Sequence, residues 1–378
     1  MVQKGKLALW ALPELTQLKR VDFPTFGSPT IPHFRDIKIY FTGAKLHLFM
    51  ILSAFSVGSG HLRGMGKLIL ACSVLVLFFN VENFFDYRDS GSGDSDREFS
   101  SRGERRWTRR RFEAKCAAIA ETLFYAEDAL GALPDVVGFA EVENRYALRA
   151  LLERTGLKKT DYEIVHFDSP DHRGIDVALL YRRSRLRLVA ARPVRIPSLQ
   201  TRDILLAQFV ETETGDSLAV SVNHHPSKYG GDEGAAGRLV VARALVAAHD
   251  SLRAASWTRQ LAVGDFNDVP DGPAPALIAA ALPSLAAPLA ARGEGSIRFD
   301  GRWELIDQAY ASPELAPQAG MEVFRPPFLL TRDAVHGGEK PLRTYVGPRY
   351  QGGVSDHLPI LVRISSGTAG PSSSSPAP

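Results

Sequence analysis

The stretch LAVGDFNDVP, residues 261–270, has the side chains of the sequence that are best suited to chemistry. Its apolar start is bounded by Gly264, which is typical of the end of a buried strand, and it leads directly to Asp265, Asn267 and Asp268. Carboxylate and amide oxygens gathered at a strand end suit a hard divalent cation and a phosphate. The same residue types also form simple turns, because they bond to their own backbone.

A second polar corner favours the chemical interpretation. The run SDHLP, residues 355–359, contains His357 and stands just before another apolar strand, residues 360–364. Further polar side chains interrupt or follow apolar runs in the same way, and these are Asn80, Glu82, Glu141, His224 and Asp307. Because open sheets bind their ligands at strand ends, the recurrence predicts one shared site.

Composition sets the broad class. The chain has 378 residues, of which 45% are hydrophobic and 23% charged, so it is a globular protein with enough residues for one large domain or two small ones. A net charge of +3 allows an anionic substrate without requiring one. Cys72 and Cys116 lie in apolar patterns and are expected to be buried thiols, with no disulfide framework and no metal-binding spacing.

The two ends of the chain differ from its centre. Residues 21–34 are rich in proline without periodicity, and the apolar run 46–57 is short for a bilayer span. We therefore expect residues 1–64 to be an irregular or disordered extension outside the mature fold, residues 65–365 to form one catalytic domain, and residues 366–378 to form a disordered tail.

The region after Met65 has two interpretations. Residues 65–79 resemble a signal peptide, but they run into Asn80 without a cleavage-like spacer. We interpret them mainly as the first core strand, so that a cytoplasmic location is slightly favoured over export.

Strand and helix patterns alternate along the centre of the chain. Helices are expected from a Thr108 cap to about Leu130, at 146–153 and at about 235–252, and a charged Gly/Ser loop at 87–106. Strands are expected at 68–81, 136–140, 162–167, 175–181, 186–194, 204–211, 218–223, 261–264, 303–309, 321–324 and 358–364. This order predicts an α/β fold in which two mixed β-sheets pack face to face with helices outside.

Seven motifs, taken in order, resemble the endonuclease/exonuclease/phosphatase superfamily. They are FNVENFFD (79–86), GFAEVEN (138–144), HRGIDVALLY (172–181), VNHHPSK (222–228), GDFND (264–268), ELIDQ (304–308) and SDHLP (355–359). Each motif alone is weak, but GDFND followed by SDH with an upstream glutamate is specific. The resemblance covers about residues 68–364 and implies a four-layer α/β sandwich with Mg²⁺-dependent phosphoester hydrolase activity.

The resemblance also implies a metal centre. Glu141 matches the family's principal metal-binding glutamate, and carboxylates are good ligands for an ion that keeps several waters. Asn80 matches an asparagine that helps to hold both the metal and the phosphate, and Asp356 matches a further acidic residue. Glu82 stands where some members have a second acidic residue, although Glu82 and Asp356 could also be merely solvated. The expected ion is Mg²⁺, with Mn²⁺ as a substitute.

Four more residues match the family's catalytic positions. Asp265 and Asn267 correspond to the pair that orients the attacking water and contacts the scissile phosphate. His357 corresponds to the catalytic histidine, and Asp307 to the carboxylate that fixes its tautomer and favours its protonated form.

Three basic features are expected near the phosphate. His224 resembles the second histidine of the deoxyribonuclease and phosphatase branches, but the neighbouring His225 could be the aligned residue, because adjacent strand residues point to opposite faces. Arg173 is a candidate phosphate contact, since guanidinium groups match phosphate oxygens. The run 105–111, which includes Trp107, could contact a nucleic-acid backbone or be a solvated face.

Nucleic acid is the favoured substrate, hydrolysed by an endonuclease-type phosphodiesterase. The alternatives are a phosphatase or phospholipid phosphodiesterase acting on inositol phosphates or sphingomyelin, and a non-catalytic binding scaffold of the same fold. The scaffold is disfavoured because no catalytic position is missing. A nuclease needs a basic extended groove and a phosphatase a closed pocket, so the loops 87–106 and 230–237 would decide. No protein partner is implied, and a monomer is expected.

Overall fold

The computed structural model describes residues 73–91 and 93–365. The expectations for residues 1–64, for the tail 366–378, for Cys72 and for the first residues of the predicted strand 68–81 therefore lie outside the described residues. None of the helices in the described part of the chain combines the length and the apolar character needed to cross a bilayer.

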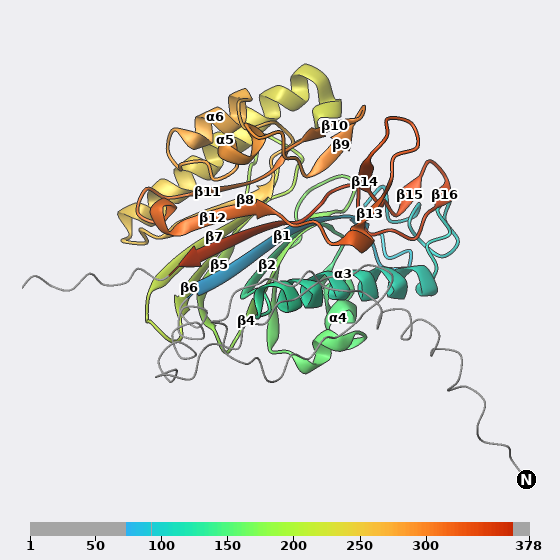
Figure 1. Ribbon diagram of the computed structural model, residues 1–378, viewed down its shortest axis with the longest axis horizontal. Helices are drawn as coiled ribbons and strands as arrows, with labels where there is room; N and C mark the ends of the chain where they lie inside the picture. Colours follow the sequence, from blue (N-terminus) through green and yellow to red (C-terminus); the bar gives the residue numbers. More distant parts are fainter. Residues whose placement is uncertain (1–72, 92, 366–378) are drawn as a thin grey trace, which may run out of the picture. The chain divides into compact units, whose positions relative to one another are not determined.

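Two large sheets dominate the described chain (Figure 1). Sheet A has the order β12 (Ala319–Val323), β17 (Ile360–Ser365), β1 (Ser73–Phe84), β2 (Val136–Val142), β4 (Asp176–Arg182) and β3 (Tyr162–His166). Sheet B has the order β11 (Asp307–Ala311), β8 (Gln260–Asp265), β7 (Ser217–His224), β6 (Ile204–Glu211) and β5 (Leu186–Val194). β1 pairs in parallel with β2, and β7 with β8, whereas the other neighbours are antiparallel, so both sheets are mixed as predicted.

Helices cover the outer face of each sheet, which gives four layers (Figure 1). α3 (Arg109–Leu130) and α4 (Arg145–Glu153) pack on sheet A, whereas α5 (Gly231–Ala254) and α6 (Pro273–Ala279) pack on sheet B. Thr108 caps α3 as predicted, because its side chain accepts a hydrogen bond from the backbone of Arg111. The predicted two-sheet sandwich covered by helices is confirmed.

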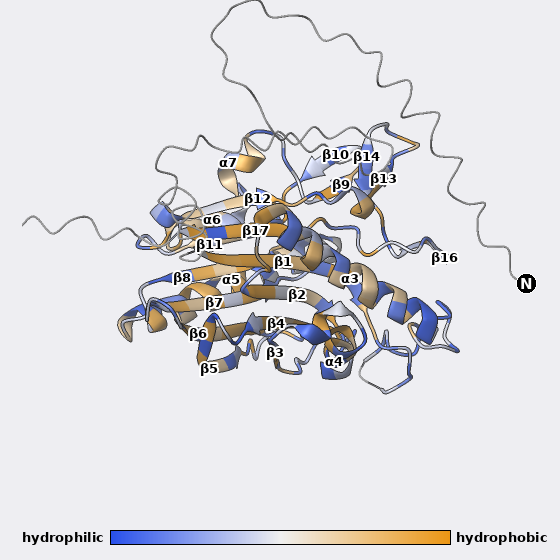
Figure 2. Cartoon of the chain, turned by 60° about the horizontal axis from the view of Figure 1, so that its bottom comes forward, coloured by the Kyte–Doolittle hydropathy of each residue, from blue (hydrophilic) through white to orange (hydrophobic). Residues whose placement is uncertain are grey.

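The inner faces of the two sheets form a shared apolar core. Alternate residues of β1 and of β7, among them Phe78 and Val222, point into it. Gly138 on β2 lies at the interface between the sheets, since a Cβ there would be 3.1 Å from Val222 of sheet B and 3.2 Å from Phe78 of its own sheet. Figure 2 shows that apolar residues are concentrated on the strands of both sheets.

Small two-stranded sheets occupy the end of the sandwich where β1 and β8 terminate (Figure 1). They pair β9 (Ile297–Phe299) with β10 (Arg302–Glu304), β13 (Leu330–Arg332) with β14 (Glu339–Pro341), and β15 (Tyr345–Val346) with β16 (Arg349–Tyr350). Short helices complete the chain: α7 (Ala287–Ala290), η1 (Gly156–Lys159), η2 (Lys228–Gly230), η3 (Ala316–Gln318) and η4 (Pro327–Leu329).

Two predicted elements were wrong in detail. The single strand expected at 303–309 is two strands, β10 and β11, in different sheets. Leu305 and Ile306 are buried where the chain passes from one sheet to the other, so the apolar pattern continues through the corner. α5 begins at Gly231 and not at 235, because acidic residues in its first turn, Asp232 and Glu233, compensate for the poor helix propensity of glycine.

The predictions for isolated buried groups have mixed outcomes. Cys116 is buried on α3, as expected. Trp107 is fully buried and donates a 2.8 Å hydrogen bond from Nε1 to the carbonyl of Phe85. It belongs to the core and cannot contact a ligand, whereas the exposed residues of the run 105–111 are Arg106, Thr108, Arg109 and Arg110.

Candidate active site

Breaks in strand register turn polar side chains toward the inside of a cavity. β1 and β2 lose register between Asn80 and Phe84, and β2 and β4 lose it between Ala140 and Val142. Within these bulges Glu82 has φ 45° and Glu141 has φ 63°. Such left-handed backbone is unfavourable for side chains with a Cβ and is common at functional sites.

Hydrogen bonds hold these strained residues in place. The backbone N–H of Asn83 donates to Glu141 Oε2 at 2.8 Å, and that of Glu82 donates to Asn80 Oδ1 at 3.0 Å. Just after β8 of sheet B, Asn267 has φ 51°, and its backbone N–H donates to Asp265 Oδ1 at 2.9 Å. The polar groups that lie far apart in the sequence are thereby fixed at one end of the sandwich.

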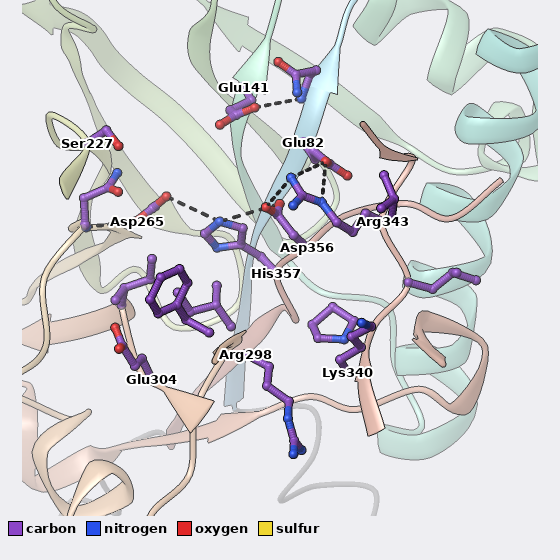
Figure 3. Close-up of a pocket in the computed structure, with 18 of the residues that line it drawn as sticks. Glu82, Glu141, Ser227, Asp265, Arg298, Glu304, Lys340, Arg343, Asp356 and His357 are labelled. Carbon is purple, nitrogen blue, oxygen red and sulfur yellow. Dashed lines mark hydrogen bonds and ion pairs between the residues drawn. The ribbon is translucent and has the colours of Figure 1, made fainter. Parts of the chain in front are cut away.

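A cavity of about 980 Å³ opens at this end (Figure 3). Most of the predicted site residues line it, namely Glu141, Arg173, His224, Asp265, Asn267, Asp356 and His357. Asn80 and Asp307 are buried next to residues that line it. The structure thus brings all nine predicted residues to one place.

His357 is held by a carboxylate on the side away from the cavity. Its Nδ1 lies 2.7 Å from Asp307 Oδ2, which also accepts a 2.5 Å hydrogen bond from Ser296 Oγ. Nε2 lies 3.8 Å from Asp265 Oδ2 (Figure 3). Although burial acts to lower it, the carboxylates of Asp307 and Asp265 raise the pKa of His357 well above its ordinary value.

Asp265 connects the two sheets. Asn80 on β1 donates from Nδ2 to Asp265 Oδ2 at 3.0 Å. Burial raises the pKa of Asp265 to about 7, against the opposing effect of His357. A carboxylate in this range can accept a proton near neutral pH.

The two adjacent histidines have different surroundings. His224 lines the cavity, with Nε2 3.6 Å from Asp265 Oδ2. His225 does not line the cavity; it is fully buried and packs edge-on against Phe266 at 4.8 Å between ring centroids. Burial, with Arg202 and Arg173 nearby, lowers the pKa of His224 well below its ordinary value. His224 is therefore a neutral imidazole in these surroundings.

Arg173 lies beside Glu141. Its Nη2 donates to Asn83 Oδ1 at 2.6 Å and lies 3.5 Å from Glu141 Oε2. The guanidinium lines the cavity and is in a position to meet a phosphate.

The oxygen donors at the site suit a hard divalent cation. Glu141 faces the cavity, and its Oε2 accepts only one backbone hydrogen bond. Asp265, Asp307 and His357 bring ligand atoms within 4.8 Å of one another. The short hydrogen bond between His357 and Asp307 fits a carboxylate that orients the imidazole better than it fits two ligands of one ion. We therefore regard Glu141 as the primary candidate for a metal ligand.

Sequence reasoning missed several basic residues at the site. Arg202 lines the cavity and pairs with Asp171 at 3.1 Å, and Arg343 bridges Glu82 and Asp356. No motif includes either arginine. Lys115 could have been found from the sequence, because it lies next to the apolar face of α3, where a lysine is a candidate buried charge. The structure shows that it is buried.

Comparison with known families identifies the fold. Residues 75–366 match the model of the Endonuclease/Exonuclease/phosphatase family. The chain belongs to this family. Members of the endonuclease/exonuclease/phosphatase family are hydrolytic phosphoesterases that generally use a divalent metal ion, and the acidic and histidine side chains described above could bind one.

Solved structures of the family include several that are similar to this chain. A humanized TDP2 from D. rerio is 16% identical, with a TM-score of 0.49, and the match covers 78% of this chain and 99% of that one. The human Nocturnin catalytic domain is 18% identical (TM-score 0.48; 78% and 94% covered). A mannosyl-6-phosphatase from Bacteroides thetaiotaomicron is 15% identical (TM-score 0.48; 76% and 98% covered). No curated protein matches the chain significantly.

Proposed function

We propose that this chain is a Mg²⁺-dependent phosphodiesterase that hydrolyses nucleic acid. The observation that supports this most directly is the oriented His357–Asp307 pair, with His357 Nε2 3.8 Å from Asp265 Oδ2, at one cavity that Glu141 also lines. A family of phosphoester hydrolases provides the reaction class.

The metal site in this proposal is built on Glu141, with Asn80 beside it. A bound Mg²⁺, for which Mn²⁺ can substitute, would neutralise charge on the phosphate and on the leaving oxygen. The strained backbone of Glu141 and its hydrogen bond from Asn83 hold the carboxylate in place before any ion arrives. The residue is thus preorganised for binding.

Proton transfer is assigned to Asp265 and His357. Asp265, with its raised pKa, accepts a proton from the attacking water. The backbone N–H of Asn267 donates to the carboxylate of Asp265 and keeps it oriented. His357 donates a hydrogen bond from Nε2 to a phosphoryl oxygen, and Asp307 stabilises the positive charge of the imidazole as the phosphate becomes more anionic. The ester P–O bond breaks as the new P–O bond forms.

His224 and Arg173 are assigned to the substrate. Arg173 contacts a phosphoryl oxygen through its guanidinium. His224 is neutral in the protein alone, so the negative charge of a bound phosphate has to raise its pKa enough for the imidazole to take up a proton from solvent. In that state His224 can donate a proton to the leaving oxygen.

Four lining residues from the small hairpins, which we call the substrate wall, favour a polymer over a small head group. Phe299 and Val346 line the cavity and are 53% and 56% exposed. Arg332 and Arg349 line it as well, and within the described chain their side chains have no ion-pair partner. An exposed ring that can stack on a base, here that of Phe299, together with arginines that can bind phosphates, is typical of single-stranded nucleic-acid sites.

The test compares substrates and wall variants. The wild-type protein is assayed with Mg²⁺ on an oligonucleotide, supercoiled plasmid, an abasic duplex, inositol phosphates, sphingomyelin and a small aryl phosphodiester. We expect Phe299→Ala and Arg349→Met each to lower kcat/KM for the oligonucleotide by roughly tenfold, the equivalent of one stacking or phosphate contact, and to leave the aryl ester unchanged. Preferential hydrolysis of inositol phosphates or sphingomyelin would instead support the phosphatase or phospholipid alternative.

A further inference from the structure

Two carboxylates of the cavity are bridged by one guanidinium (Figure 3). Arg343 Nη2 lies 3.0 Å from Glu82 Oε1 and 2.9 Å from Asp356 Oδ2. We propose that Arg343 is a built-in cation that occupies the place of a second metal ion, so that the site binds one divalent ion, at Glu141. The inference rests on the metal-dependent function proposed above.

Glu82 has little capacity left to bind a metal ion. Its Oε1 accepts hydrogen bonds from Arg343 Nε at 3.1 Å and Nη2 at 3.0 Å, and its Oε2 accepts one from the backbone N–H of Thr344 at 2.8 Å. The side chain is buried, so water cannot easily replace these donors. An incoming ion would have to break two charge-assisted hydrogen bonds from one guanidinium before it could bind.

The segment that carries Arg343 is anchored to two other elements. Thr344 donates from Oγ1 to the carbonyl of Val354 at 3.0 Å and accepts a hydrogen bond from Lys115 Nζ at 2.8 Å. The same Lys115 Nζ donates to the carbonyl of Glu82. α3, β1 and the chain before β15 are thereby tied together, and Arg343 is held at the bridging position.

The guanidinium still faces the substrate. The Arg343 side chain is 48% exposed and lines the cavity with Asp356 and His357. A planar guanidinium can hold a carboxylate with one edge and a phosphoryl oxygen with another. Arg343 can therefore supply, without a metal, the positive charge that a second ion would provide.

The test counts bound ions and does not depend on catalysis. Mn²⁺ is titrated into the full chain without substrate, by calorimetry and by the electron paramagnetic resonance of the free ion. We expect one Mn²⁺ per chain for the wild type and a second one for Arg343→Met, which exposes the Glu82–Asp356 pair. Arg332→Met is the matched control: it removes one positive charge from the same cavity but leaves the pair bridged, so one ion is expected.

A second substitution separates charge from position. Arg343→Lys keeps a cation beside the pair and should still bind one Mn²⁺, which gives a result even if Arg343→Met does not fold. Two ions on the wild type, or a single ion on a folded Arg343→Met, would overturn the inference and leave the proposed function intact. The expected ion counts together with no hydrolysis of any nucleic acid would overturn the proposed function alone. A wild type that binds no Mn²⁺ would overturn both.

Discussion

His357 and Asp307 lie fifty positions apart in the chain and meet in a 2.7 Å contact. In the proposed mechanism the carboxylate orients the ring and stabilises its charge while the phosphate is attacked. We expect His357→Ala and Asp307→Ala each to lower kcat by on the order of a hundredfold or more. The double variant should lose far less than the product of the two losses, as for residues that act as a unit.

The measurement is a double-mutant cycle on kcat/KM with the best phosphodiester substrate. A matched variant, Asp307→Asn, keeps the shape but removes the charge that raises the pKa of His357. A protonated His357 is lost as the pH rises through its pKa, so the alkaline limb of the pH–rate profile should move to lower pH in Asp307→Asn. Strictly additive losses and an unmoved limb would mean that the two residues do not share a role.

Glu141 is the second residue whose charge can be tested separately from its packing. Glu141→Gln keeps the size of the side chain and can still accept the hydrogen bond from Asn83, so the fold should survive. Loss of the carboxylate charge should abolish metal-dependent hydrolysis. Activity is measured with Mg²⁺ or Mn²⁺ and with excess chelator, and thermal unfolding is the control. Undiminished wild-type hydrolysis in chelator would contradict the prediction.

The sequence was informative about residues that follow apolar runs in short motifs, such as Asp265 and His357. It was not informative about Arg343, because that residue meets Glu82 across 261 positions and belongs to no motif. Nor could it show that burial makes His224 neutral, since this depends on neighbours from three separate segments. Residue type is local information, whereas charge state is set by the folded surroundings.

At the scale of elements, hydrophobic periodicity predicted the large sheets and the long helices. β5 and β6 have the predicted bounds, because apolar runs between turn residues are strong strand signals. The strand β9 and the pairs β13–β14 and β15–β16 were missed, since each of these strands has two or three residues and shows no period. The proposed substrate wall is built from these short elements, so the sequence located the proposed catalytic centre better than the wall.

The β13–β14 hairpin depends on one buried carboxylate. Asp333 accepts hydrogen bonds from the backbone N–H of Val335 at 3.1 Å and of His336 at 3.3 Å, and lies 3.3 Å from Lys340 Nζ. Although burial acts to raise it, these donors lower the pKa of Asp333 to about 2. Asp333→Asn should therefore loosen the hairpin and raise KM for an oligonucleotide, because Arg332 loses its support.

The pH dependence of this effect has a definite sign. A carboxyl group whose pKa is lowered by folding stabilises the folded state at pH values above its ordinary pKa, near 4. That stabilisation is lost as the pH falls toward the lowered pKa of the folded state. Amide hydrogen exchange over residues 330–341 should differ between wild type and Asp333→Asn at pH 7, and the difference should shrink between about pH 4 and pH 2. A difference that stays constant with pH would show that the charge of Asp333 is not the cause.

At the scale of the whole molecule, the site exists because two sheets end together. Asn80 and Glu141 come from sheet A, whereas His224 and Asp265 come from sheet B. The hydrogen bond from Asn80 to Asp265 crosses from one sheet to the other. Any change in the packing of the sheets would therefore separate the groups that we propose to bind the metal from those that we propose to move the proton.

The proposed start of the catalytic domain also depends on how the strands pack in sheet A. We propose that residues 65–365 form the catalytic domain, since the family match spans residues 75–366 and β1 lies between β17 and β2 at the centre of sheet A. A chain that begins at Met65 keeps all of β1, so it should unfold cooperatively at the temperature of the full chain and retain kcat/KM within about twofold.

A chain that begins at Phe79 is the contrasting variant. It lacks Ser73–Phe78, the residues of β1 that pair with β17, and so leaves β17 and β2 with unpaired edges inside the sandwich. We expect this chain to be insoluble or to lack a cooperative transition. Circular dichroism melts and Mg²⁺-dependent hydrolysis are compared for the three chains. If the chain from Met65 also lost its solubility or its transition, residues before Met65 would belong to the fold, and the proposed boundary would have to move toward the start of the sequence.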